Sequence, residues 1–319
     1  MKVLIIKLGA LGDIITSTSI IEQIIKHHAN DEIYFLTSSG FEKILLSFEK
    51  LNIVSFGKKG LAEKIKPILW IRQNKFDRIY DLQSNDRTTL YCALSASPYR
   101  VGNHPRCPYH KHPKTKYIGE CHSFNRLNQM LESADIEKAH PRPFLPITNT
   151  IISEVSEWLN KKKLSDKSFV LLHAGSSAMH LQKRWPFFSE LASILNERYP
   201  IVWIGGSDDS EINKNLSLKI GIDATNQFSI LALAQLGKKA AFAVTNDSAP
   251  MHILSCSDIP VFGLFGPTYA RRTHALGQLE NVITAQTKIA KNDQSFVPED
   301  ISNISVDKVI NKLEERGLI

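Results

Sequence analysis

Residues 2–17, KVLIIKLGALGDIITS, contain an apolar run, a glycine-containing turn and the start of a helix. Valine, leucine and isoleucine fill the run without polar alternation, which is typical of a strand buried on both faces of a parallel sheet. The turn LGALGD (8–13) leads into residues 14–27, where apolar side chains recur every three or four positions as in an amphipathic helix. The stretch predicts the first strand, turn and helix of an α/β protein.

The same alternation continues along nearly the whole chain. Short β-branched runs alternate with amphipathic stretches, the pattern of βαβ units that build parallel sheets. We therefore expect an α/β fold of two doubly wound, Rossmann-like domains facing a cleft. Ligands of such sheets bind outside the carboxyl ends of the strands. The expected strands lie at 2–8, 32–37, 52–56, 77–82, 168–174, 200–206, 240–246 and 260–266, and a further helix at 185–198.

The boundary between the two domains is expected in HPRPFLPITNT (140–150). Its three prolines cannot continue a helix or occupy a central strand. A chain of 319 residues is also longer than one hydrophobic core usually grows. We expect an N-terminal domain at 1–148, a C-terminal domain at 149–304 and a terminal amphipathic helix at 305–319.

The composition, 43% hydrophobic and 22% charged, is that of an ordinary globular protein. No apolar run approaches the roughly 20 residues that span a bilayer. Lys7 and Asp13 interrupt the first apolar run, which therefore does not fit a secretory signal. The four cysteines show neither a CxxC pair nor a disulfide framework. We expect a cytoplasmic protein.

The net charge of +7 is distributed unevenly. Residues 1–150 contain 21 lysines and arginines against 14 acidic residues, whereas residues 151–319 contain 18 of each. The whole excess therefore lies in the N-terminal half. A nucleic acid, an acidic membrane surface or an anionic acceptor would each be attracted to such a field.

The segment TNDSAPMHILS (245–255) predicts a helix start directly after a buried strand. Asp247 and Ser248 offer N-cap oxygens, and Pro250 suits a first helical turn. The free amides and positive dipole end of such a helix can bind a diphosphate. A well-capped structural helix is the alternative interpretation.

Two further segments that follow strands support a phosphate site. FGPT (265–268) places Gly266 and Thr268 in a tight turn. HAGSSAMHLQKRWP (173–186) adds two hydroxyls and two cations, and lysine is a common point-charge ligand of phosphate. These loops together predict a pocket for a nucleotide diphosphate; the residues from the second segment are Ser176, Ser177, Lys183 and Arg184.

The chain resembles the bacterial ADP-heptose:lipopolysaccharide heptosyltransferases, glycosyltransferase family 9. Any one of the similar motifs is short, but they occur in the family's order over nearly the whole chain. They are KLGALGD (7–13), DLQSNDRT (81–88), HSFNRL (122–127), KRWP (183–186), TNDSAPMH (245–252) and LFGPT (264–268).

The resemblance implies a glycosyltransferase B (GT-B) fold with an N-terminal acceptor domain and a C-terminal nucleotide-sugar domain. It implies that the terminal helix packs back on the first domain. It also implies an inverting transfer of heptose from ADP-heptose to an inner-core lipopolysaccharide acceptor, without a metal or other cofactor. The expected partners are the nucleotide sugar and an anionic acceptor at the inner membrane surface, where the protein would be peripheral. We expect a monomer and no nucleic-acid partner.

Asp13 is the candidate catalytic residue. An inverting transfer needs one carboxylate to accept the proton of the attacking hydroxyl. The corresponding aspartate is the base proposed for the family. The alternative is an ordinary helix N-cap, for which aspartate is a favoured residue.

The resemblance also assigns ligand-binding residues. For the donor, Asp247 would contact sugar hydroxyls, and Ser248, Ala249 and His252 the phosphates or the same ligand; the family usually has glycine at Ala249. Asp209 would contact the ribose, with Glu211 as the alternative. The acceptor residues would be Gly12, Asn85, Arg87, Arg106, His122 and Arg126, with a packing role as the alternative for His122.

The stretch 99–117 is rich in histidine, lysine and arginine, and we expect it to be a loop that meets the anionic acceptor. Its histidines and nearby cysteines also suggest zinc, but their spacing matches no compact zinc finger. Two other functions remain open for the chain. One is a family relative that uses another nucleotide sugar or a protein acceptor, and the other is a polyanion-binding protein without enzyme activity.

Overall fold

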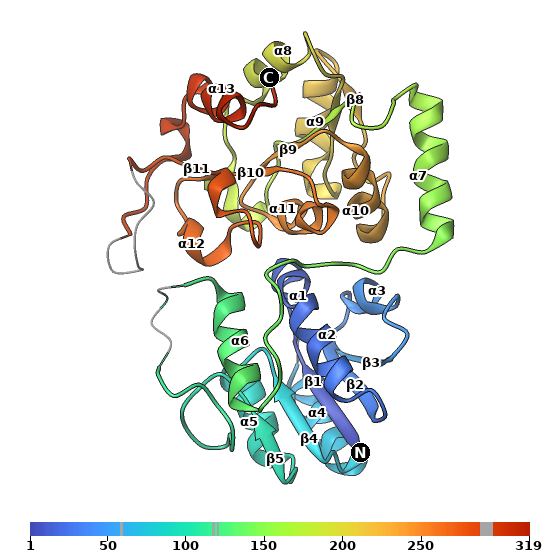
Figure 1. Ribbon diagram of the computed structural model, residues 1–319, viewed down its shortest axis with the longest axis vertical. Coiled ribbons are helices and arrows are strands. Elements are labelled where there is room, and N and C mark those ends of the chain that lie inside the picture. The colour runs from blue at the N-terminus through green and yellow to red at the C-terminus, as the bar shows by residue number, and fades with distance from the viewer. Residues whose placement is uncertain (58–59, 117–118, 120, 288–295) are drawn as a thin grey trace. The chain divides into compact units, whose positions relative to one another are not determined.

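The computed structural model describes residues 1–57, 60–116, 119, 121–287 and 296–319. The chain forms two compact units, Met1–Pro146 and Ile147–Ile319, shown in Figure 1. The division falls inside the proline-containing stretch and close to the boundary expected after residue 148. Among the described helices, none is long and apolar enough to cross a bilayer.

The first unit contains a five-stranded parallel sheet in the order β3-β2-β1-β4-β5. β1 lies in the middle, which explains why its apolar run has no polar alternation: Val3 to Ile6 are fully buried. The strands are β1 Lys2–Ile6, β2 Glu32–Ser38, β3 Leu51–Phe56, β4 Arg78–Asp81 and β5 Tyr99–Val101. The helices are α1 Leu11–Thr16, α2 Thr18–His27, α3 Glu42–Leu45, α4 Leu61–Asn74, α5 Asp86–Leu94 and α6 Ser123–Ser133.

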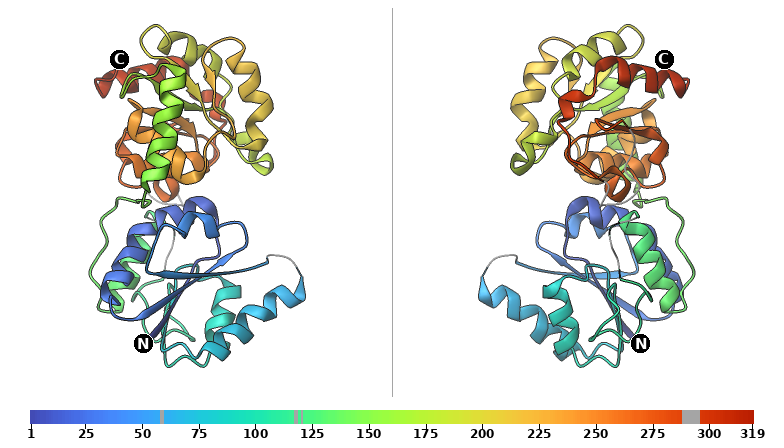
Figure 2. Two further views of the ribbon diagram at one scale, coloured as in Figure 1. Left: turned by 90° about the vertical axis from the view of Figure 1, so that its right-hand side faces the viewer. Right: turned by 90° about the vertical axis from the view of Figure 1, so that its left-hand side faces the viewer.

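The second unit contains a six-stranded parallel sheet in the order β11-β10-β9-β6-β7-β8. α10 contacts both α7 and α11, and α8 contacts α13; Figure 2 shows these helices from two sides. The strands are β6 Val170–His173, β7 Ile201–Trp203, β8 Ile222–Asp223, β9 Ala243–Asn246, β10 Val261–Phe265 and β11 Val282–Thr284. The helices are α7 Asn149–Lys162, α8 Phe188–Leu195, α9 Ser210–Ser217, α10 Ile230–Lys239, α11 Ala249–Leu254, α12 Ala270–Thr273 and α13 Val306–Glu315.

Each sheet has the Rossmann strand order, in which the order of strands reverses at one point. The reversal lies between β1 and β4 in the first unit and between β6 and β9 in the second. The doubly wound α/β fold expected from the sequence is confirmed. All eight expected strands are present, and the three strands that the sequence did not indicate, β5, β8 and β11, are short and lie at sheet edges.

The helix expected at 14–27 is interrupted. α1 ends at Thr16 and α2 begins at Thr18, because Ser17 leaves helical geometry. The hydroxyls of Ser17 and Thr18 donate to the carbonyls of Ile14 and Ile15, each at 2.8 Å. Such back-bonding competes with the regular helix ladder and bends the chain.

The terminal helix packs in the core of the second unit, whereas the expectation that residues 305–319 pack on the N-terminal domain stays a prediction. Val309 and Leu313 of α13 are fully buried in the core of the second unit. α13 contacts α8 and β11, and Trp185 Nε1 donates to the carbonyl of Ile304 just before it, at 2.7 Å. Apolar burial against its own unit fixes this helix.

Candidate active site

Polar side chains of the second unit gather where β6 and β9 end. This is the point where the strand order reverses, and ligands of open parallel sheets bind at the carboxyl ends of strands at such a point. His173 is the last residue of β6 and Asn246 the last residue of β9. The donor residues predicted from the sequence follow β6, β7, β9 and β10, so the topology brings four distant segments to one edge of the sheet.

Asp247 connects two of these loops. Its Oδ2 accepts hydrogen bonds from Lys183 Nζ at 2.7 Å and from Thr268 Oγ1 at 2.8 Å. Lys183 Nζ also donates to the Asp247 carbonyl at 3.3 Å. The Asp247 side chain is 7% exposed and that of Lys183 18%, so the ion pair is shielded while the ammonium still reaches solvent. Three predicted donor residues thus form one cluster with a fixed cation.

His173 forms a second chain of contacts and was not among the predicted residues. Its Nδ1 lies 3.1 Å from Ser248 Oγ and its Nε2 lies 3.3 Å from Asp209 Oδ2. An ionised carboxylate only accepts, so Nε2 carries a proton, and in a neutral imidazole Nδ1 is left to accept from the serine. The signal in the sequence that could have identified His173 is its place as a polar residue at the end of an otherwise apolar strand.

Asp209 lies inside the unit and not at its surface. It is 6% exposed, and its Oδ2 also accepts from the Gly206 amide at 2.9 Å. Burial by itself would raise the pKa of Asp209, but the hydrogen bond with His173, that amide and the charge of Arg184 outweigh burial and lower the pKa. The carboxylate expected at the ribose therefore faces His173. Glu211, the alternative, is exposed in the first turn of α9.

The side chain of Ser248, the N-cap residue of α11, makes no capping hydrogen bond. Ser248 occupies the N-cap position, but its hydroxyl bonds to His173, and Asp247 faces Lys183 and Thr268. Pro250 lies in the first turn as expected. The alternative of a helix capped by Asp247 or Ser248 is therefore not what the structure shows. Ala249 begins the helix, and His252 is half-buried one turn later.

The two serines after β6 have different positions. Ser176 is buried; its Oγ donates to the His180 carbonyl at 3.0 Å and accepts from Arg184 Nε at 3.3 Å. Ser177 is exposed and caps the short 3₁₀ helix Ala178–Lys183. Ser176 therefore fixes the loop internally, whereas Ser177 presents its hydroxyl to solvent.

Gly266 allows two backbones to approach closely. A Cβ at this position would lie 2.6 Å from Ile301 Cα, and the Gly266 carbonyl accepts from the Glu299 amide at 3.1 Å. A pocket of about 360 Å³ adjoins this contact, with Arg184 and Pro267 among its lining residues. The predicted donor loops thus border a cavity within the second unit.

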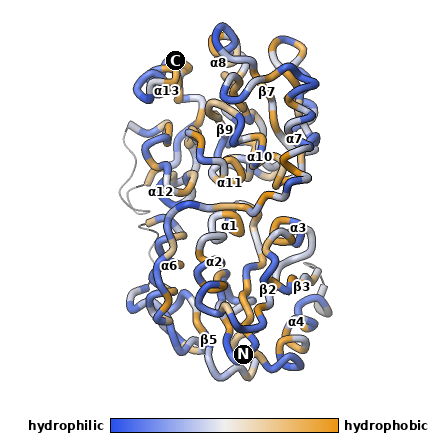
Figure 3. Tube along the Cα trace, turned by 45° about the vertical axis from the view of Figure 1, so that its right-hand side comes forward, coloured by the Kyte–Doolittle hydropathy of each residue, from blue (hydrophilic) through white to orange (hydrophobic). Residues whose placement is uncertain are grey.

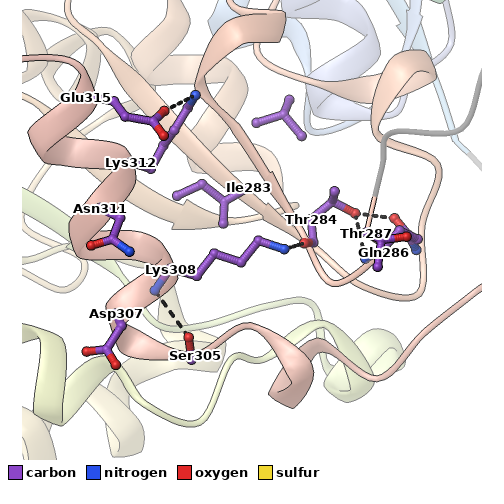
Figure 4. Close-up of a pocket in the computed structure, with 11 residues that line it drawn as sticks. Ile283, Thr284, Gln286, Thr287, Ser305, Asp307, Lys308, Asn311, Lys312 and Glu315 are labelled. Carbon is purple, nitrogen blue, oxygen red and sulfur yellow. Dashed lines mark hydrogen bonds and ion pairs between the residues drawn. The ribbon is translucent and has the colours of Figure 1, made fainter.

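Another pocket of the second unit, of about 460 Å³, lies between β11 and α13 (Figure 4). Lys308 Nζ donates to the Thr284 carbonyl at 2.8 Å, and Lys312 pairs with Glu315 at 2.9 Å. None of the predicted site residues lines this pocket. We therefore place the candidate donor site at the ends of β6 and β9.

In the first unit, Asp13 is the third residue of α1 and is exposed. Its Oδ2 accepts from the amide of Ala10, the N-cap residue, at 3.2 Å. Asp13 therefore closes the turn from inside the helix and is not the N-cap. Gly12 is the second helical residue, and Gly9 has a φ of +137°, which side chains rarely adopt. The turn presents a carboxylate at the carboxyl end of β1.

Two buried charged groups lie behind this turn. Lys7 ends the apolar run after β1, and its Nζ donates to the Leu82 carbonyl at 3.3 Å. Burial lowers the pKa of Lys7, and the charges of Asp13 and Asp81 oppose that effect. Burial raises the pKa of Asp81, which accepts from Tyr109 Oη at 2.6 Å. Lys7 therefore places a buried amine near Asp13. The sequence did not indicate a functional role for Lys7.

The expected acceptor residues are found on loops that meet at this edge of the first sheet. Leu8 N donates to Gln83 Oε1 at 3.1 Å, which joins the β1 and β4 loops. Asn85 caps α5, accepting from Thr88 N at 3.0 Å. Arg87 is half-buried in the first turn of α5, and the exposed Arg106 lies 4.0 Å from Asp86.

Arg126 and His122 were expected to contact the acceptor, but both side chains are buried and bond within the first unit. Arg126 is buried, with Nε donating to Asn103 Oδ1 at 2.5 Å and Nη2 to the Thr115 carbonyl at 2.6 Å. His122 is also buried, and its Nδ1 accepts from Phe124 N at 3.1 Å at the start of α6. Arg126 anchors the described part of the 99–117 stretch, called the basic loop below. His122 has the packing role left open above and also caps α6.

The histidines of the basic loop bond to their own unit. His104 Nε2 lies 2.7 Å from the Ser84 carbonyl, and His110 Nδ1 accepts from Arg100 N at 3.1 Å. Within the described parts of the chain, no three histidine, cysteine or acidic side chains are grouped as they would be around a metal ion. The 99–117 stretch is described up to residue 116.

Two Rossmann-type units, each built on a doubly wound parallel sheet, are the architecture of the GT-B class of proteins. Within that class, the sequence profile of glycosyltransferase family 9 (heptosyltransferase) matches residues 69–299. The chain belongs to this family, and the resemblance noted in the sequence is confirmed.

Several known proteins are similar over nearly their whole length. Lipopolysaccharide heptosyltransferase 1 of Campylobacter coli is 23% identical, covering 99% of this chain and 98% of the relative. A solved family 9 glycosyltransferase from Veillonella parvula superposes with a TM-score of 0.81 at 21% identity, covering 98% and 96%. Escherichia coli heptosyltransferase WaaC, solved with ADP, superposes with a TM-score of 0.71 at 17% sequence identity, covering 99% of this chain and 98% of WaaC. WaaC was also solved with ADP-2-deoxy-2-fluoro heptose.

Gly175→Ala should destabilise the donor site. The added methyl would lie 1.8 Å from Asp209 Oδ1 and would force the carboxylate away from His173. We expect the free energy of unfolding in urea to fall by about 1–3 kcal/mol, the usual cost of overpacking. Gly206→Ala is the matched control, because nothing lies within 4 Å of its Cβ and its φ is −96°. Equal losses in both variants would contradict this role for Gly175.

Proposed function

We propose that the protein is a lipopolysaccharide heptosyltransferase. It transfers heptose from ADP-heptose to an inner-core sugar, with inversion at the anomeric carbon. The observation that carries the proposal is the Lys183, Asp247 and Thr268 cluster at the reversal point of a Rossmann sheet, in a chain of the heptosyltransferase family. The ADP in the E. coli relative supports a nucleotide donor.

The donor diphosphate is proposed to lie against Lys183 and the first turn of α11. The Lys183 ammonium is fixed by the Asp247 carboxylate and carbonyl, so little reorganisation is needed when charge develops on the leaving group. Ser248 and Ala249 begin this helix, and the Ser248 side chain makes no capping hydrogen bond with its amides. The chain itself supplies positive charge for ADP as it departs.

The remaining donor contacts divide into direct and indirect ones. Ser177 is exposed and Thr268 half-buried, so each can offer a hydroxyl to the ligand, and His252 lies one turn into α11. Ser176 and Asp209 are buried and act through Arg184 and His173. Gly266 closes the loop before Thr268. Asp247 orients Lys183 and remains able to contact a sugar hydroxyl.

Asp13 is proposed as the general base. The acceptor hydroxyl oxygen attacks the anomeric carbon, the bond from that carbon to the diphosphate breaks, and the hydroxyl proton passes to the Asp13 carboxylate. The exposed position of Asp13 suits a group that must reach substrate. Lys7 lies buried behind it, and the charge of Asp13 opposes the lowering of the Lys7 pKa by burial.

The cations at the same edge of the first sheet are proposed to receive the anionic acceptor. Arg106 is exposed on the basic loop, and Arg87 is the second residue of α5, whose N-cap is Asn85. Arg126 holds the loop through Asn103 and Thr115 and is a positioning residue. Gly12 lets the α1 turn approach a sugar closely.

An assay of the purified protein tests the proposed function. The protein is incubated with ADP-heptose and Kdo-lipid A or a heptosylated core acceptor, and the products are measured by mass spectrometry. We expect ADP release together with an acceptor heavier by one heptose. If ADP-heptose stayed unchanged with every inner-core acceptor and another nucleotide sugar were turned over, ADP-heptose would not be the donor.

Asp13→Asn should lower kcat by about 10²–10⁴-fold, because the amide cannot accept the proton. The affinity for ADP, measured by calorimetry, should not change, since the donor residues belong to the second unit. Asp307→Asn is the control, because Asp307 is also an exposed acid in the first turn of a helix. A wild-type kcat in Asp13→Asn would remove Asp13 from the role of base.

Lys183→Gln should weaken ADP binding by about 10- to 100-fold, the value of one or two charge-assisted hydrogen bonds. Calorimetric titration of ADP measures the change. Lys214→Gln, on the exposed side of α9, removes the same charge away from the site and should leave the affinity unchanged. Equal affinities of the two variants would place the diphosphate elsewhere.

A further inference from the structure

Two helices of the first unit expose large aliphatic side chains to solvent. On α4, Ile65 is 44% exposed and Leu69 is 54% exposed; on α5, Leu90 is 50% and Leu94 is 41% exposed. We call these four residues the α4–α5 surface. Single exposed apolar residues are common, but a contiguous group on a protein surface marks an interaction site.

The four side chains lie on two helices that contact each other. Ile65 and Leu69 are four residues apart on one helix face, as are Leu90 and Leu94 on the other helix. α4 contacts α5, and Arg72 Nη1 donates to the Leu94 carbonyl at 3.4 Å. Figure 2 shows α4 and α5 side by side on the first unit.

The packing of the unit does not require these residues to be apolar. The inner faces of the two helices are already filled by Ile71 of α4 and by Tyr91 and Cys92 of α5, all of which are buried in the core. A surface helix with one buried face normally carries polar residues on the opposite face. α4 instead carries apolar and charged residues mixed along its length, as Figure 3 shows.

The surroundings of the α4–α5 surface are basic. α4, α5 and the residue that follows α4 carry five cations and two carboxylates. Glu63, one of the two carboxylates, is already paired with Lys66. Among the described residues, Lys64 and Lys75 have no carboxylate within ion-pair distance, and both are exposed. The five cations are Lys64, Lys66, Arg72, Lys75 and Arg87.

We propose that the α4–α5 surface docks on an anionic lipid bilayer. Aliphatic side chains flanked by lysine and arginine match the interface of a bilayer with acidic headgroups, where apolar burial and charge attraction add. A second copy of the chain is a poorer occupant, because a symmetric contact would place the same excess of cations on both sides. None of the proposed donor residues, nor Asp13, belongs to this surface.

Sedimentation with lipid vesicles tests the proposal on the full-length chain. The vesicles contain phosphatidylethanolamine and phosphatidylglycerol, with pure phosphatidylcholine as the neutral comparison and no glycolipid in either. The wild-type protein should bind the anionic vesicles at least about tenfold more strongly than the neutral ones, since each basic residue near the surface adds about 1 kcal/mol. Added salt should weaken this binding.

Ile65→Ser/Leu69→Ser should bind anionic vesicles about tenfold more weakly, because two aliphatic side chains no longer enter the interface. Lys64→Glu/Lys75→Glu should lose the preference for anionic lipid. Leu218→Ser, which changes a side chain that is 77% exposed on the second unit, should bind like the wild type. Circular dichroism and thermal unfolding identify any variant that fails to fold.

Wild-type binding by the Ile65→Ser/Leu69→Ser variant would overturn the proposal, as would equal binding of the wild type to the two kinds of vesicle. Light scattering addresses the other occupant: a wild-type dimer that the double variant converts to a monomer, with unchanged lipid binding, would assign the surface to a second copy. The vesicles contain no substrate, so these results are independent of the proposed function. Turnover of a soluble acceptor should be unchanged in the double variant.

Discussion

The side-chain amide of Asn246 fixes the strand ends on which the candidate donor site depends. Asn246 is fully buried at the end of β9, and its Nδ2 donates to the carbonyls of Ala174 and Gly175 at 2.9 and 3.0 Å. Its Oδ1 accepts from the Trp185 amide at 3.1 Å. A buried amide that lost one of these partners would cost about 1–3 kcal/mol. The loop after β6, the end of β9 and the start of the segment leading to α8 therefore keep one relative geometry. His173 directly precedes Ala174, and Lys183 lies shortly before Trp185, so both are close in sequence to these bonded residues.

Both units place buried carboxyl groups near the reversal points of their sheets, and each group accepts hydrogen bonds from its own unit. Asp81 accepts from the amides of Gln83 and Ser84 and from Tyr109 in the first unit. Asp209 accepts from His173 and Gly206 in the second. Burying a carboxylate is costly unless it is hydrogen-bonded, and these bonds offset that cost while ordering the loops. The residues available to touch a ligand, such as Asp13 and Lys183, rest on this rigid layer.

The sequence predicted the parts of the fold that follow from burial. The eight predicted strands lie in apolar runs because parallel strands are covered on both faces, whereas β5, β8 and β11 combine an edge position with a length of two or three residues. The terminal helix is amphipathic, but an apolar stripe does not say which core it joins, and only the structure shows that α13 joins the core of the second unit. The donor cluster could be predicted because glycine, serine and aspartate follow strand ends. The contacts between side chains could not: Asp209 and Ser248 were both expected at the ligand, and only the structure shows that His173 lies between them.

The charges of the two units suit the different demands that the proposed reaction makes on them. At the donor site each cation has a carboxylate near it: Lys183 lies 2.7 Å from Asp247, and Arg184 lies 3.9 Å from Asp209. A nucleotide diphosphate therefore meets cations that are already partly neutralised, and ADP can leave after transfer. The first unit has the whole excess of positive charge, much of it exposed on the basic loop and around α4 and α5. A lipid-linked acceptor stays at a membrane surface. Tight binding of that surface by the first unit would therefore not slow turnover, whereas tight binding of ADP by the second unit would. Under the two proposals above, the charge asymmetry between the units separates holding the enzyme at a surface from releasing its nucleotide product.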